Sequence, residues 1–144
     1  MRQIVFLVSL LVLLSACSTD SENNDQQASS CDRLLEVSQS KFDAASVDEF
    51  EVTSASIDGD CLSLQISYEG GCNEPTIQLI GSATVEAGSP PIRTLRIKVD
   101  TKGDSCTDLT SATLTFDLSA LQLDLENRFE LKIKGWNQSL IYTY

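Results

Sequence analysis

Histidine is absent from this chain of 144 residues, and basic residues are scarce. Without histidine, the sequence lacks the side chain that most often serves as a general base and as a metal ligand. Ten lysines and arginines stand against 21 aspartates and glutamates, which gives a net charge of −11. We do not expect such an acidic chain to bind nucleic acid, because phosphate groups require a basic surface. Three prolines and seven glycines are too few for a wholly disordered or collagen-like chain.

The sequence also lacks a recognisable catalytic arrangement. No GxSxG motif occurs, and without histidine only a lysine or a carboxylate could activate a serine. Two acidic pairs, Asp58 with Asp60 and Asp100 with Asp104, could serve glycoside hydrolysis or calcium binding if each faced a cleft. Both pairs lie in turn-like sequence, where aspartate commonly bonds to nearby backbone. We therefore expect a protein that is not an enzyme, with no cofactor and no metal site.

The one extended hydrophobic run lies at the N-terminus. Arg2 precedes an apolar stretch over residues 4–14 that is broken only by Ser9. As a helix this stretch would span about 16 Å, roughly half of a bilayer core, so it predicts the hydrophobic region of a signal peptide. The following Leu14-Ser15-Ala16-Cys17 resembles the lipobox of bacterial lipoproteins. The alternative is an ordinary secretory signal followed by a coincidental cysteine.

The lipobox resemblance implies three segments. Residues 1–16 are a signal peptide, 17–30 are the lipidated Cys17 and a disordered acidic tether, and 31–144 are a single domain. Acylated Cys17 would anchor the chain to the lipid bilayer without spanning it. Serine at position 18 resembles the outer-membrane sorting signal of Gram-negative lipoproteins. The acidic residues after it resemble the surface-export signal of Bacteroidetes lipoproteins; the alternative is a merely soluble linker.

Alternating apolar and polar residues predict an all-β domain. Such alternation gives each strand one buried and one solvated face. About seven short strands separated by turn signals favour an antiparallel sandwich or a small barrel, and we predict an immunoglobulin-like β-sandwich. The strands are expected near residues 50–57, 62–68, 77–85, 95–99, 114–118, 129–133 and 140–144. A weak signal at Leu34, Leu35 and Val37 suggests one short helical turn.

The four remaining cysteines predict two disulfides in an exported domain. Cys61 and Cys72 flank one strand and would lie some 30 Å apart, too far for a bond. Either Cys31–Cys61 with Cys72–Cys106 or Cys31–Cys72 with Cys61–Cys106 remains. We favour the first pairing, because Cys72 and Cys106 both follow strand ends. The spacing contains no CxxC motif, which argues against a cysteine-ligated metal.

Three segments carry a family resemblance: the run from Cys61 to Cys72 (CLSLQISYEGGC), Gly103-Asp104-Ser105-Cys106, and the run from Phe116 to Leu121 (FDLSAL). Their order is similar to small Bacteroidetes lipoproteins of unknown function. The resemblance implies no established activity. Some members carry histidines near the second and third of these cysteines. Histidine is absent here, so no metal role carries over.

Two features could bind a ligand. Strand alternation places Arg96 with Lys98, and Lys132 with Lys134, on outward faces that would form a basic patch if their strands were neighbours. Such a patch could bind an anionic glycan or a lipid headgroup; the alternative is a solvated face with lysines that prevent edge pairing. Trp136, in a predicted turn, could bind a sugar or an envelope protein. The alternative for Trp136 is a role in closing the core.

Overall fold

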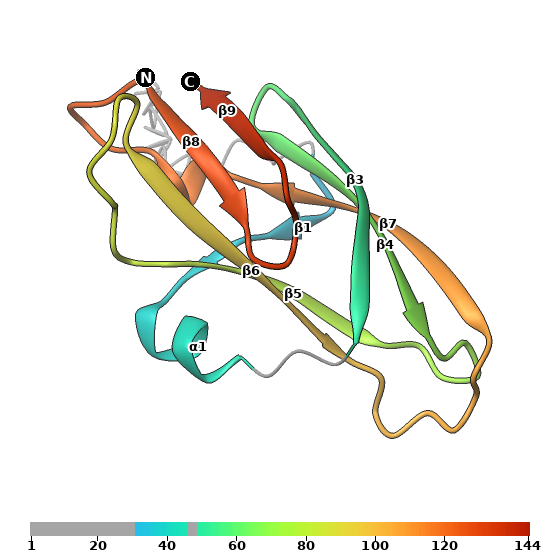
Figure 1. Ribbon diagram of the computed structural model, residues 1–144. Helices are drawn as coiled ribbons and strands as arrows, with labels where there is room; N and C mark the ends of the chain where they lie inside the picture. The colour runs from blue at the N-terminus through green and yellow to red at the C-terminus, as the bar shows by residue number, and fades with distance from the viewer. Residues whose placement is uncertain (1–30, 46–48) are drawn as a thin grey trace, which may run out of the picture.

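The computed structural model describes residues 31–45 and 49–144, so the predicted signal peptide, Cys17 and the tether lie outside the described residues. Two β-sheets pack against each other, and a short helix lies beside them (Figure 1). The elements are β1 (Arg33–Leu34), β2 (Glu36–Val37), α1 (Gln39–Ala44), β3 (Phe50–Asp58), β4 (Cys61–Glu69), β5 (Thr76–Gly81), β6 (Ile92–Asp100), β7 (Leu109–Asp117), η1 (Ser119–Leu121), β8 (Arg128–Ile133) and β9 (Ser139–Thr143).

The first short strands connect the two sheets. Sheet A has the order β1-β7-β4-β3, and sheet B has the order β2-β5-β6-β8-β9. Strand β1 lies on the edge of sheet A and β2 on the edge of sheet B, with Leu35 buried between them. The chain therefore crosses from one sheet to the other along one side of the sandwich.

The core consists of the inward rows of both sheets. In β6, for example, Leu95, Ile97 and Val99 are buried while Arg96 and Lys98 point outward, as period-two alternation requires. The largest fully buried side chains are Tyr142, Phe116, Phe129, Leu62, Leu64, Ile66, Leu79, Leu95, Ile97, Leu118, Leu121 and Leu131. Both sheets contribute to this set, so one continuous core holds them together.

The predicted β-sandwich is confirmed in its coarse form, but the prediction of antiparallel sheets is wrong at three pairings. Strand β1 runs parallel to β7, β2 runs parallel to β5, and β6 runs parallel to β8. Both sheets are therefore mixed. The sequence could not show this, because side chains alternate with the same period in parallel and antiparallel strands.

The strand order also departs from the predicted immunoglobulin-like arrangement. In that fold the third strand pairs with the sixth. Here the third long strand, β5, pairs with β6, which follows it directly in the chain. The described residues contain nine strands rather than about seven. The two additional strands, β1 and β2, are only two residues each and were too short to be predicted. Strands β1 and β2 occupy the positions of the predicted helical turn, and the helix α1 begins later, at Gln39.

The described helices are short. The side-chain oxygen of Ser38 accepts a hydrogen bond from the backbone N–H of Lys41 at 3.4 Å and so caps the start of α1. None of the described helices is long and apolar enough to cross a membrane.

The favoured cysteine pairing is confirmed. Cys31 is bonded to Cys61, with 5.6 Å between their Cα atoms, and Cys72 is bonded to Cys106, with 5.9 Å. Cys61 begins β4, a strand with neighbours on both sides. The first disulfide therefore fixes the start of the described chain to the interior of sheet A.

Candidate binding surface at the Trp136 hairpin

The hairpin between β8 and β9 presents the single tryptophan of the chain. Gly135 has a φ of 88°, a conformation that glycine adopts readily. The backbone N–H of Trp136 then donates to the carbonyl of Ile133 at 3.0 Å and closes the turn. Trp136 is half-buried and packs against the core. Its side chain therefore closes the core in part and leaves part of its surface accessible.

Two grooves flank Trp136 and share the turn residues 136–138. The first has a volume of about 290 Å³ and also contains side chains of β8 and β9. The second has a volume of about 440 Å³ and extends to β3. The further lining residues are Glu130, Lys132 and Ser139 in the first groove, and Glu51, Val52, Thr53 and Gly135 in the second. An aromatic ring among amide, hydroxyl and charged groups suits a ligand with both apolar faces and hydroxyl groups.

The predicted basic residues lie on the outer side of sheet B, because β6 and β8 are neighbours there. Lys132 lies opposite Thr94 in the register, and the backbone N–H of Lys134 donates to the carbonyl of Leu95 at 2.8 Å. Of these cations, Lys132 alone lines one of the two grooves described above, where its ammonium nitrogen lies 3.9 Å from a carboxylate oxygen of Glu130. Lys98 and Lys134 line neither of the two grooves.

Arg96 contacts α1 as well as lying on the outer side of sheet B. Its guanidinium donates to the carbonyl of Ala45 at 3.0 Å and lies 4.8 Å from the centre of the Phe42 ring. The cation therefore binds the end of α1 and the residue that follows it. Arg96 holds α1 against sheet B, and its guanidinium is already in contact with groups of the protein.

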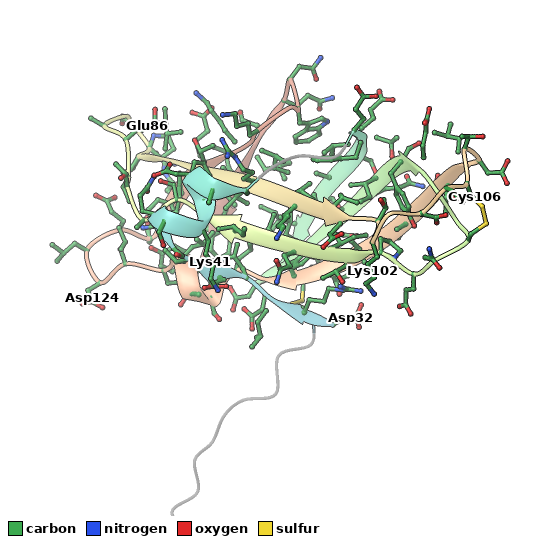
Figure 2. All side chains as sticks on the ribbon, turned by 90° about the horizontal axis from the view of Figure 1, so that it is seen from below. Asp32, Lys41, Glu86, Lys102, Cys106 and Asp124 are labelled. Atoms are coloured by element: carbon green, nitrogen blue, oxygen red, sulfur yellow. A yellow bond between two sulfur atoms is a disulfide. The ribbon has the colours of Figure 1, made fainter. Side chains whose placement is uncertain are left out.

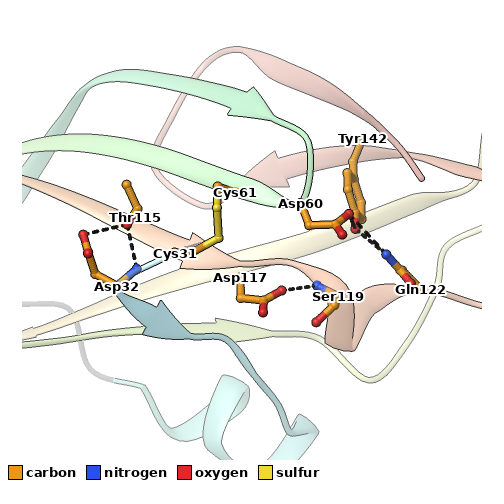
Figure 3. The surroundings of a disulfide bond; sticks show 9 residues. All are labelled: Cys31, Asp32, Asp60, Cys61, Thr115, Asp117, Ser119, Gln122 and Tyr142. Carbon is orange, nitrogen blue, oxygen red and sulfur yellow. Dashed lines mark hydrogen bonds between the residues drawn. A yellow bond between two sulfur atoms is a disulfide. The ribbon is translucent and has the colours of Figure 1, made fainter. Parts of the chain in front are cut away.

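The turn carboxylate Asp60 joins the two sheets (Figure 3). The hydroxyl of Tyr142, on β9, donates to a carboxylate oxygen of Asp60 at 2.6 Å, and the Gln122 amide donates to the same oxygen at 3.2 Å. The Gln122 amide also donates to the Tyr142 hydroxyl at 2.9 Å. Burial, followed by the bond to Asp60, raises the pKa of Tyr142 well above its ordinary value. These hydrogen bonds give the Asp60 carboxylate a structural role.

Asp104 is bound by four backbone N–H groups. One carboxylate oxygen accepts from Gly71 at 3.0 Å and from Cys72 and Asn73 at 2.9 Å, and the other oxygen accepts from Cys106 at 3.0 Å. These bonds, of which those from Cys106 and Asn73 contribute most, lower the pKa of the Asp104 carboxyl. With the Cys72–Cys106 disulfide, Asp104 fastens the segment after β4 to the segment before β7.

Sequence reasoning missed both of these networks. The only local signal was the aspartate two residues before Cys106, which suits a bond from side chain to local backbone. The ligand atoms of Cys72, Asp104 and Cys106 lie within 4.8 Å of one another, as at a metal site. The two sulfurs are joined in a disulfide, however, so they offer no thiolate to a metal.

No family model matches this chain, and no curated protein matches it. The solved structures with a similar fold include two Bacteroides proteins. A protein of unknown function, DUF1344, from Bacteroides vulgatus superposes with a TM-score of 0.53 at 11% identity and covers 78% of this chain. A NigD-like immunity protein from Bacteroides caccae superposes with a TM-score of 0.56 at 13% identity and covers 79%.

At such low identity the similarity shows the fold alone. This chain matches only 56% of the Bacteroides vulgatus protein and 60% of the Bacteroides caccae protein, so it spans less than two thirds of either.

Proposed function

We propose that this chain is a lipid-anchored protein of the cell envelope whose β-sandwich is a binding domain and not an enzyme. The lipobox at Cys17 and the acidic tether support the lipid anchor. The serine at position 18 supports a location at the outer membrane. The similar folds come from Bacteroides species, which agrees with the resemblance to Bacteroidetes lipoproteins. The carboxylates that we considered for catalysis at Asp60 and Asp104 are hydrogen-bonded within the fold, which supports a non-enzymatic role.

Replacing the anchor residue tests the localisation. With Cys17→Ser, we expect the protein to lose incorporation of labelled palmitate and to leave the membrane fraction, because no thiol remains to carry the diacylglycerol. Palmitate labelling and fractionation of cells measure both effects. A matched Ser18→Ala variant should remain labelled. Labelling that survives in Cys17→Ser, or a wild-type protein without acyl groups, would reject the anchor.

The observation that carries the binding function is the pair of grooves that share Trp136. Their lining combines a half-buried indole with Asn137, Gln138 and hydroxyl side chains, which suits the apolar faces and hydroxyl groups of a sugar. The ligand class best supported is therefore a glycan. Lys132 in the first groove would add preference for an acidic sugar.

Binding to immobilised oligosaccharides tests this ligand class. Trp136→Ala should weaken binding of a glycan ligand roughly tenfold or more, because truncating a central tryptophan commonly has effects of this size. Ile141→Ala, at an exposed position of β9 that lines neither groove, is the matched control and should bind as wild type does. Lys132→Ala should weaken only acidic glycans. An array with no binding, or equal binding by Trp136→Ala, would reject the glycan and leave an envelope protein as the partner.

A further inference from the structure

Arg93 is a buried cation in a position where the fold calls for an apolar residue. It lies in the inward row of β6 together with Leu95, Ile97 and Val99. Only 4% of its surface is exposed, and it is the one buried charged residue in the described part of the chain. Long basic side chains are seldom buried this far unless they are paired.

The described residues give this cation little compensation. Its guanidinium carbon lies 5.5 Å from the centre of the Phe129 ring, which provides a cation–π contact. Its Nε is buried and has no hydrogen-bond partner, and no carboxylate of residues 31–45 or 49–144 forms an ion pair with it. Burial lowers the pKa of Arg93, and the nearby Tyr144 partly offsets this shift. A buried charge without a counter-ion is costly, because the fold must remove its water without replacing it.

Arg33 and Arg96 differ from Arg93 in that a terminal guanidinium nitrogen of each donates to a backbone carbonyl, although the Nε of Arg96, like that of Arg93, is buried without a partner. Arg33 donates to the carbonyl of Ile77 at 3.1 Å, and Arg96 donates to the carbonyl of Ala45. Arg93 has no comparable partner among the described residues, although 21 residues of the chain are acidic. The described residues therefore supply no oxyanion to Arg93.

The position of Arg93 restricts the kind of oxyanion. Ile92, its neighbour, pairs with Glu86, and Figure 2 shows Glu86 and Asp124 at the same end of the sandwich, opposite Cys106. These negative charges repel a dianion more strongly than a monoanion. The planar guanidinium fork also matches the two oxygens of a carboxylate. Beside it lie the aromatic rings of Phe129 and Tyr144, whose centres are 5.8 Å apart.

From these observations we infer that Arg93 binds the carboxylate group of a ligand at the end of the sandwich formed by the start of β6. This site is distinct from the Trp136 grooves, because Arg93 belongs to the inward row of sheet B and lines neither groove. The inference does not depend on the function proposed for Trp136.

Sodium formate titrated into the full domain at pH 7 and constant ionic strength, with sodium chloride as the balancing salt, tests the site. In ¹H–¹⁵N spectra the Nε–H signal of Arg93 should shift and saturate with formate. Formate should also raise the unfolding midpoint over chloride. Arg93→Met, in which an apolar side chain of similar length replaces the cation, should fold and lose both effects. Arg128→Gln, which removes an exposed arginine of β8, should retain them.

Three results would overturn the inference. The first is an Arg93 signal that does not shift, or that shifts linearly without saturation. The second is an equal rise of the unfolding midpoint in Arg93→Met. The third is inorganic phosphate binding more tightly than formate, which would contradict the assignment to a carboxylate.

Discussion

Removing the first disulfide by the double substitution Cys31→Ser and Cys61→Ser is expected to lower the free energy of unfolding by about 3–4 kcal/mol. The bond closes a loop with a sequence separation of 30 residues. In the chain-entropy description, freeing a loop of that length stabilises the unfolded state by roughly this amount at 25 °C. Urea unfolding of both proteins under oxidising conditions measures the difference in the free energy of unfolding.

The second disulfide provides the matched control. Cys72 and Cys106 are separated by 34 residues, so the same description predicts nearly the same loss for the Cys72→Ser and Cys106→Ser pair. The local consequences should differ. Without Cys31–Cys61, β1 is held to β7 by two residue pairs and by the bonds between Asp32 and Thr115, so its amide hydrogens should exchange faster. An unchanged free energy in the first pair would contradict the expectation.

Phe116→Ala is expected to lower the free energy of unfolding by about 3–5 kcal/mol, the usual cost of deleting a buried aromatic ring. Phe116 is 1% exposed and lies in register with Arg33 on one side and with Leu62 on the other. Its ring therefore packs where three strands of sheet A meet the core. Thermal or urea unfolding measures the loss.

An outward-facing position on the same strand serves as the control for Phe116. Thr113 of β7 is exposed, so Thr113→Ala should change the free energy of unfolding by less than about 0.5 kcal/mol. A loss below about 1 kcal/mol in Phe116→Ala would mean that the ring is not part of a tightly packed core.

Sequence periodicity located the long strands but not their partners. Alternation in β4, β6, β7 and β8 is regular, because each of these strands has one face in the core. Parallel and antiparallel strands show the same alternation of side chains, so the pattern did not indicate the direction of pairing. The segments at β1 and β2 were missed because two residues are too few to show any period.

The candidate sites were predictable to different degrees. Trp136 was identified from its residue type and its turn, but Glu51 and Thr53 were not, since tertiary packing alone brings β3 to that groove. Tyr142 and Asp60 lie 82 residues apart in the sequence and gave no joint signal. Arg93 was readable: it is in phase with Leu95, Ile97 and Val99, so the alternation already placed it among core residues.

With the proposed anchor at Cys17, the Cys31–Cys61 bond would have a mechanical consequence for the domain. Tension on the polypeptide ahead of Cys31 would pass through the two sulfur atoms into β4, which is flanked by β3 and β7. The two residue pairs of β1 would then bear little of the load. Pulling would have to shear a central strand with nine-residue neighbours rather than unzip a two-residue edge, which makes the junction resistant to force.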